Sequence, residues 1–162
     1  MKYKQQNQTK KFFEKDAKNW SSKSDFKKNI ILNTIQERNL YVIDKIRKFK
    51  IKSLIDVGWG SGDLAFEASK ILDKSVGIDF SKNMINLAEK KFKKKNLQYK
   101  NLNFFDYKFN ERFNCVSANG FIEYLSLDDI KKFIKISNNM LVKNGYLIFG
   151  TRNRLFNLYS LN

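Results

Sequence analysis

Apolar residues recur along the chain with two alternating spacings, one typical of buried strands and one typical of helices. Short β-branched runs predict strands over 51–57, 75–80, 101–105, 113–118 and 145–151. Between them, apolar positions three or four apart predict helices over 63–72, 82–95 and 127–142. An amphipathic helix precedes the first strand, with Ser24 and Asp25 as candidate caps and Ile31, Ile35, Val42, Ile46 and Phe49 on one face.

Strands that alternate with helices of this length favour a parallel sheet joined by right-handed crossovers. We therefore expect an α/β fold, a Rossmann-like, doubly wound and mostly parallel sheet of about five strands with helices on both faces. The chain has no internal repeat and no linker rich in Pro, Gly or Ser, so residues 24–162 are expected to form a single domain. Residues 1–23 form a polar lead, in which Phe12, Phe13 and Trp20 either cover a ligand as a lid or dock the lead onto the sheet.

The composition excludes several classes of enzyme. The chain has 162 residues, of which 42% are hydrophobic, enough for one sizeable core. It has one cysteine, Cys115, and no histidine, which excludes an internal disulfide, a cysteine zinc site and every mechanism that needs histidine. We expect no metal site, and we expect Cys115 to be a small buried hydrophobe. With no apolar run of membrane-spanning length and no secretory signal, we expect a cytoplasmic protein.

The net charge of +16 raises the prior for a nucleic-acid partner, because phosphates attract basic surfaces. Only five of the 32 basic residues are arginine, however, and the lysines are spread along a chain that is also rich in Asn and Ile. Arg152 and Arg154, just beyond the last predicted strand, are candidates for gripping a phosphate on a substrate. A nucleic-acid partner thus stays an alternative that the sequence does not favour.

A glycine-rich turn follows the first predicted strand, with Gly58, Gly60 and Gly62 at alternate positions. Such turns let a ligand approach the backbone, and two classes of ligand compete for this one. A dinucleotide needs the spacing Gly-x-Gly-x-x-Gly, whose third glycine would fall at Asp63. A carboxylate there would repel a diphosphate, so NAD and FAD are disfavoured relative to a cofactor with a cationic centre.

Acidic residues follow the next two predicted strands. Asp79 ends the second strand and can accept hydrogen bonds from both hydroxyls of a ribose, and Phe80 follows it beside the base. Asp106, after Phe105 at the end of the predicted third strand, can accept from an adenine amino group. Each residue alone is more often part of a turn. Together, at the ends of successive strands, they favour a nucleoside site.

These segments resemble the class I S-adenosylmethionine-dependent methyltransferases, of the kind that includes ubiquinone-biosynthesis and related small-molecule methyltransferases. The motifs run in the family's order over residues 24–151: they are the segments 56–62, 76–84, 105–106, 113–120 and 141–148. The resemblance implies S-adenosylmethionine as cofactor and a small-molecule methyl acceptor. It implies cofactor contacts from Asp56, Gly58, Trp59, Gly60, Gly62, Asp79, Phe80, Met84, Phe105, Asp106 and Asn119.

The chain also departs from the family pattern. Trp59 stands where a small residue is usual, so it either stacks on the cofactor or obstructs the site, and Tyr124 stands where many relatives have histidine. A weak acceptor would need a base, for which Glu123, Asp106 and Tyr124 are the candidates.

The family's sixth and seventh strands are missing, so we expect a truncated product or part of a longer protein whose fifth strand is an exposed edge open to self-association. Two other functions stay open. One is a non-catalytic or partner-dependent S-adenosylmethionine-binding module, and the other is an RNA methyltransferase.

Overall fold

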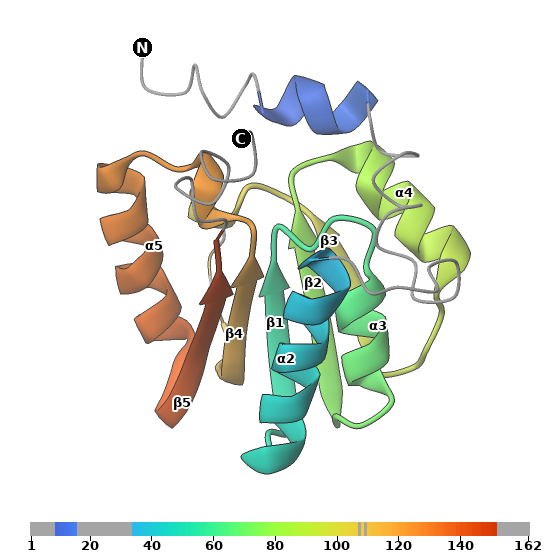
Figure 1. Ribbon diagram of the computed structural model, residues 1–162, viewed down its shortest axis with the longest axis vertical. Coiled ribbons are helices and arrows are strands. Elements are labelled where there is room, and N and C mark those ends of the chain that lie inside the picture. The colour runs from blue at the N-terminus through green and yellow to red at the C-terminus, as the bar shows by residue number, and fades with distance from the viewer. Residues whose placement is uncertain (1–8, 16–33, 107, 109, 152–162) are drawn as a thin grey trace, which may run out of the picture.

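The computed structural model describes residues 9–15, 34–106, 108 and 110–151, and these residues form one parallel sheet flanked by helices (Figure 1). Its five strands lie in the order β3-β2-β1-β4-β5, and every neighbouring pair is parallel. The strands are β1 (Ser53–Val57), β2 (Lys74–Asp79), β3 (Leu97–Asn101), β4 (Phe113–Asn119) and β5 (Leu141–Gly150). The fold class expected from the sequence is confirmed.

Helices connect these strands, as the spacing of apolar residues predicts. They are α2 (Thr34–Lys48), α3 (Asp63–Ser69), α4 (Lys82–Lys91) and α5 (Leu127–Met140), with short 3-10 turns η1 (Phe104–Asp106) and η2 (Ile122–Tyr124). Serine side chains begin two of the helices: Ser81 accepts a hydrogen bond from the Met84 amide in α4, and Ser126 accepts one from the Asp129 amide in α5. A further short helix, drawn blue in Figure 1, spans residues 9–15.

The sheet separates two apolar layers, because successive side chains of a strand point to opposite faces. On one face Leu54 and Cys115 pack with α2 and α3, and burial raises the pKa of the Cys115 thiol to about 12. On the other face Ile55 and Val116 pack with Phe133 of α5. A smaller cluster between α3 and α4 is built around Trp59. All strands point their carboxyl ends toward the helix over residues 9–15, which places the candidate site there (Figure 1).

The third strand lies earlier in the sequence than we expected. The sequence predicted it over 101–105, but β3 spans Leu97–Asn101, and the apolar residues after it form η1. The alternating residues of β3 pair with β2, whereas Phe104 turns into the core beside Phe133. A run of apolar residues was thus wrongly interpreted as a strand because it buries its side chains from a turn. Phe105 and Asp106 therefore do not end a strand.

Other boundaries differ by a few residues. Both α3 and α4 end earlier than expected, and α4 stops where Phe92 takes an extended backbone conformation. The strand β5 begins at Leu141, earlier than expected, and its pairing with β4 shifts register between Phe113 and Cys115. Trp20, Ser24, Asp25, Ile31 and both C-terminal arginines lie outside the described residues.

β3 and β5 are the two edges of the described sheet. The position of the fifth strand at an edge matches the expectation from the sequence. Among the described residues, no helix combines the length and the apolar character needed to cross a membrane.

Candidate functional site

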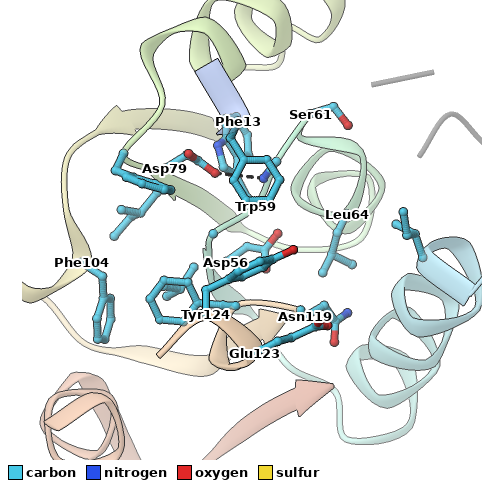
Figure 2. A pocket seen from close by; sticks show the side chains of 18 of the residues that line it. Phe13, Asp56, Trp59, Ser61, Leu64, Asp79, Phe104, Asn119, Glu123 and Tyr124 are labelled. Atoms are coloured by element: carbon cyan, nitrogen blue, oxygen red, sulfur yellow. Dashed lines mark hydrogen bonds between the residues drawn. The ribbon is translucent and has the colours of Figure 1, made fainter. Parts of the chain in front are cut away.

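A cavity of about 320 Å³ opens at the carboxyl ends of the strands, beneath the helix over residues 9–15. This is the edge of a doubly wound sheet at which ligands bind. Figure 2 shows Asp56 between Asp79 on one side and Asn119, Glu123 and Tyr124 on the other. The residues along the cavity that the sequence analysis singled out are Phe13, Asp56, Gly58, Trp59, Gly60, Asp63, Asp79, Phe80, Asn119, Glu123 and Tyr124.

The glycine-rich turn forms one wall of the cavity through an unusual backbone. Gly58, Gly60 and Gly62 have φ values of 67°, 60° and 84°, in the left-handed region that side chains disfavour. The turn is tied to the neighbouring strand, because the Gly58 amide donates to the Ile78 carbonyl at 2.9 Å and the Gly60 amide donates to Asp79 Oδ2 at 3.2 Å. Alternate glycines are thus required by the path of the chain.

Asp79 is held rigidly at the end of β2. Its Oδ2 accepts from the Gly60 amide, and its Oδ1 accepts from the Ser81 amide at 2.8 Å. The side chain is buried, and this desolvation raises the pKa of Asp79 to about 7 despite the nearby backbone amides, with a further increase from the carboxylate of Glu14. Each carboxylate oxygen has a further lone pair, so this group can accept two more hydrogen bonds.

Asp56 lies at the end of the adjacent strand β1 and is likewise buried. Its Oδ1 accepts a hydrogen bond from the Ser117 hydroxyl of β4. Burial raises the pKa of Asp56 to about 7, and the nearby carboxylate of Asp79 adds to the increase. Two buried carboxyl groups beside one cavity favour a ligand that brings hydrogen-bond donors and positive charge.

The Trp59 ring packs against the neighbouring strand β2, and the residue also lines the cavity. Its ring lies over Gly77 of β2, where an added Cβ would stand 2.1 Å from Trp59 Cε3, and it packs against Tyr99 with ring centroids 4.3 Å apart. The ring therefore fills the space between α3 and α4, although the residue still lines the cavity. Its Nε1 is buried, with no hydrogen-bond partner among the described residues.

Asp63 is paired within the protein. Its Oδ1 accepts from Lys91 Nζ at 2.9 Å, and its Oδ2 accepts from the Ser61 hydroxyl at 2.6 Å. The ion pair offsets the negative charge that the sequence analysis set against a diphosphate. The spacing of the glycines still does not match a dinucleotide turn, because the position of its third glycine is occupied by Asp63.

The opposite wall of the cavity comes from α2 and the segment after β4. Asn119 Nδ2 donates to Asn39 Oδ1 at 3.4 Å, and Arg38 Nη1 donates to Glu123 Oε1 at 3.2 Å. Glu123 does not cap the following helix, whose cap is Ser126. The sequence analysis missed Arg38 and Asn39, since a polar face on an amphipathic helix gives no sign of what it meets.

Four predicted cofactor contacts do not line the cavity in this structure. They are Gly62, Met84, Phe105 and Asp106. Met84 is buried, and Asp106 is exposed. The cavity is instead lined by Leu102, Asn103 and Phe104, which directly follow β3. For Phe105 and Asp106 the displaced strand explains the change: the residues that directly follow its true end are 102–104, and these two come later.

The short helix over residues 9–15 lies above the carboxyl ends of the strands (Figure 1), and its Thr9 and Phe13 line the cavity. Phe13 lines the cavity and meets the Tyr124 ring edge-on at 5.5 Å. The Glu14 carboxylate accepts from the Lys82 amide at 2.8 Å and from the Asn83 amide at 3.3 Å. These amides lie in the first turn of α4 and have no acceptor within the helix itself. Phe12, by contrast, is 55% exposed. The interpretation as a lid thus fits Phe13. The hydrogen bonds from α4 to the neighbouring Glu14 hold it in place.

We expect Glu14→Gln to make the helix over residues 9–15 more accessible to trypsin. The variant loses the favourable interaction between the Glu14 carboxylate and the N-terminus of α4. A loss of about 1 kcal/mol would raise the rate of cleavage after Lys10 and Lys11 about fivefold, if cleavage follows local opening. Time courses of tryptic digestion measure this rate. Glu67→Gln is the matched control, since Glu67 forms an exposed ion pair with Lys70 on α3. Equal cleavage of both variants and the parent would contradict the role of Glu14.

The residues of this cavity fit S-adenosylmethionine. Asp79 can accept from both hydroxyls of a ribose, and Asp56 can accept from an ammonium group. The raised pKa of each carboxyl reflects burial without enough donors, and this ligand would supply such donors. The cavity volume is at the lower end of the range for small-molecule sites.

Comparisons with known proteins agree with this geometry. Residues 54–145 match a family model described as a methyltransferase domain. The chain is 32% identical over 152 residues to a ubiquinone biosynthesis O-methyltransferase of Pelagibacter ubique (strain HTCC1062), an alignment that covers 86% of this chain and 62% of that relative. The chain thus spans less than two thirds of the length of this relative.

Two solved structures share the fold at low sequence identity. The N-methyltransferase NodS from Bradyrhizobium japonicum WM9, in complex with S-adenosyl-L-homocysteine, has a TM-score of 0.70 at 14% identity and covers 84% of this chain and 71% of its own. CalS10, an amino pentose methyltransferase from Micromonospora echinaspora, has a TM-score of 0.63 at 17% identity, with 72% and 50% covered. Because the family model matches more than half of the sequence, the chain belongs to the methyltransferase domain family.

Proposed function

We propose that this chain binds S-adenosylmethionine and transfers its methyl group to a small-molecule acceptor. The observation that carries the proposal is the pair of buried carboxylates, Asp56 and Asp79, at the ends of adjacent strands beside a glycine turn. Both line one cavity, and neither forms an ion pair among the described residues. Such a site suits a cationic ligand that carries hydroxyl groups.

The residues of the chain bind and orient the ligands. Asp79, fixed by the amides of Gly60 and Ser81, would hold the ribose, and Asp56, oriented by Ser117, would face the methionine part. When bound, S-adenosylmethionine supplies a methyl group on a cationic sulfur that is already activated toward a nucleophile. The main task of the protein is then to align the acceptor, and such positioning can supply roughly 7–11 kcal/mol of rate acceleration.

A small acceptor is favoured by the lining of the cavity. Of the lining residues in the described part of the chain, Arg38 is the one basic side chain, and it is paired with Glu123. A site for RNA would be expected to present several cations to phosphates. The basic side chains that give the net charge of +16 are therefore not gathered around this cavity. The names of the relatives, which include O-methyltransferase and amino pentose methyltransferase, also support a small acceptor.

Thermal unfolding with added ligands tests the proposal. S-adenosylhomocysteine at 100 times its dissociation constant should stabilise the fold by about 2.7 kcal/mol. This corresponds to several degrees, at about 2–4 °C per kcal/mol for a domain of this size. S-adenosylmethionine should act in the same way and NAD should not. A folded protein whose midpoint responds to NAD, or to none of the three, would contradict the proposal.

A further inference from the structure

An ion pair forms part of the cavity wall opposite the Asp79 carboxylate. Arg38 comes from α2 and Glu123 from η2, and their Nη1 and Oε1 atoms lie 3.2 Å apart. The side chains are only 19% and 13% exposed, and both line the cavity. Arg38 is fixed further by Nε, which donates to the Thr34 carbonyl at 3.2 Å. The pair is therefore an ordered, partly desolvated element.

Two glycines provide the space that this pair occupies. A Cβ at Gly150 would stand 2.9 Å from Arg38 Cδ. A Cβ at Gly120 would stand 3.3 Å from Glu123 Oε1 and 3.4 Å from Arg38 Nη1. The amide of Gly120 also donates to the carbonyl of Gly150 at 2.8 Å, which joins the ends of β4 and β5 beneath the pair. A side chain at Gly150 would require Arg38 to shift, and a side chain at Gly120 would crowd the charged ends of both residues.

The charges of the cavity divide between its two sides. Asp56 and Asp79 lie at the ends of β1 and β2, where the proposed cofactor binds, and the carboxylate of Asp63 pairs with Lys91. The remaining wall has Arg38 and Glu123 as its charged residues. Around them the lining is mainly aromatic and aliphatic, from Phe13, Ile35, Phe121, Tyr124 and Leu125.

We propose that Glu123 binds and deprotonates a hydroxyl group of the methyl acceptor, and that Arg38 is a positioning residue that holds the Glu123 carboxylate in the cavity. This inference rests on the proposed function. A hydroxyl both donates and accepts, so it complements a carboxylate and a guanidinium side by side. A ligand with a single charge is attracted by one member of the pair and repelled by the other, whereas a neutral hydroxyl can bond to both. The apolar remainder of the wall suits a hydroxyl carried on a ring.

The proposed step balances. The acceptor hydroxyl gives its proton to the Glu123 carboxylate, and its oxygen lone pair forms the new bond to the methyl carbon. The electron pair of the broken sulfur–carbon bond stays on sulfur, which loses its positive charge. No oxidant, metal or further reactant is required.

Probe binding to the protein saturated with S-adenosylhomocysteine tests the inference without a measurement of turnover. Phenol, benzoate and benzylamine share one ring and differ in the polar group, and ligand-observed NMR titrations give their dissociation constants. We expect phenol to bind at least tenfold more tightly than the two charged probes. Glu123→Gln and Arg38→Met should each weaken phenol binding about tenfold, and Arg38→Lys should recover part of the loss. Glu67→Gln, on the exposed face of α3, is the control.

The rate of methyl transfer to phenol provides a second measurement. In Glu123→Gln the rate constant at saturation should fall by about 100-fold or more, with a much smaller change in the KM for S-adenosylmethionine, as expected for a missing base. In Arg38→Lys the rate constant should recover part of this loss. A purely structural ion pair would lower the midpoint of unfolding in every variant without this selective loss of the rate constant.

The outcomes separate this inference from the proposed function. Absence of S-adenosylhomocysteine binding by the parent protein would overturn the proposed function, and the roles of both residues with it. Normal S-adenosylhomocysteine binding together with tighter binding of benzoate or benzylamine than phenol would overturn this inference alone. Equal phenol affinity in Glu123→Gln and the parent would do the same.

Discussion

Gly77→Ala is expected to destabilise the fold by about 3 kcal/mol, the upper end of the usual range for overpacking a core. The new methyl group would stand 2.1 Å from Trp59 Cε3 and 2.4 Å from Cδ2, well inside contact distance. The ring cannot retreat easily, because Tyr99 packs against it at 4.3 Å and Gly62 and Ala88 lie at its other edge. Urea unfolding followed by circular dichroism measures the change.

A double-mutant cycle identifies the cause. Trp59→Leu removes the indole ring, so Gly77→Ala should cost at least 1 kcal/mol less on that background than on the parent, a coupling typical of residues in direct contact. An equal cost on both backgrounds would mean that the alanine acts through the strand itself, and the proposed packing of Trp59 would be wrong.

The position of Trp59 shows what a sequence reveals of a turn. From the sequence, the ring was expected either to stack on the cofactor or to obstruct the site, and in the structure it packs over β2. Gly77 is the residue that could have indicated this packing, since a glycine inside a strand often marks a close approach by another group. The spacing of residues along one segment does not reveal the direction of a side chain that crosses to another.

The order of strands and helices was predictable because each apolar run is short and separated from the next by polar residues. The third strand was misplaced because Phe104 and Phe105 are more apolar than the true strand, in which Gln98 and Lys100 alternate with Leu97 and Tyr99. β3 is an edge strand, where polar side chains cost little. The most apolar residues of this region therefore lie in the turn η1, which packs under α5, and not in the strand.

The two buried carboxylates of the site were predictable, because Asp56 and Asp79 end adjacent parallel strands. The role of Asp106 stays a prediction, but its exposed position gives it no contact with the cavity in this structure. Arg38 was not predictable. Its relation to Glu123 depends on α2 crossing the end of β4, and only the packed structure brings these elements together.

The affinity for S-adenosylhomocysteine is expected to increase as the pH rises through 7. Asp56 and Asp79 both have a pKa raised to about 7 by burial, and the bound ligand would require the carboxylate form. Between pH 6 and pH 8 the deprotonated fraction of each carboxyl rises about tenfold, so the affinity should rise about 100-fold when both must be ionised. Isothermal titration at several pH values measures it. In Asp79→Asn the affinity should be lower by about 1–3 kcal/mol and depend less on pH.

The same groups should affect the free energy of unfolding with the opposite sign. A carboxyl whose pKa is higher in the folded chain than its ordinary value of 3.8 binds more protons when folded. Its contribution to stability is therefore complete below about pH 4 and is lost as the pH rises to about 7. The ligand-free parent should lose up to about 1 kcal/mol per pH unit over this range relative to Asp79→Asn. Asp106→Asn, at an exposed position outside the cavity, is the matched control and should follow the parent. If the parent and Asp79→Asn show the same dependence of both affinity and stability on pH, the carboxyl of Asp79 is ionised throughout, and the ligand does not select its charged form.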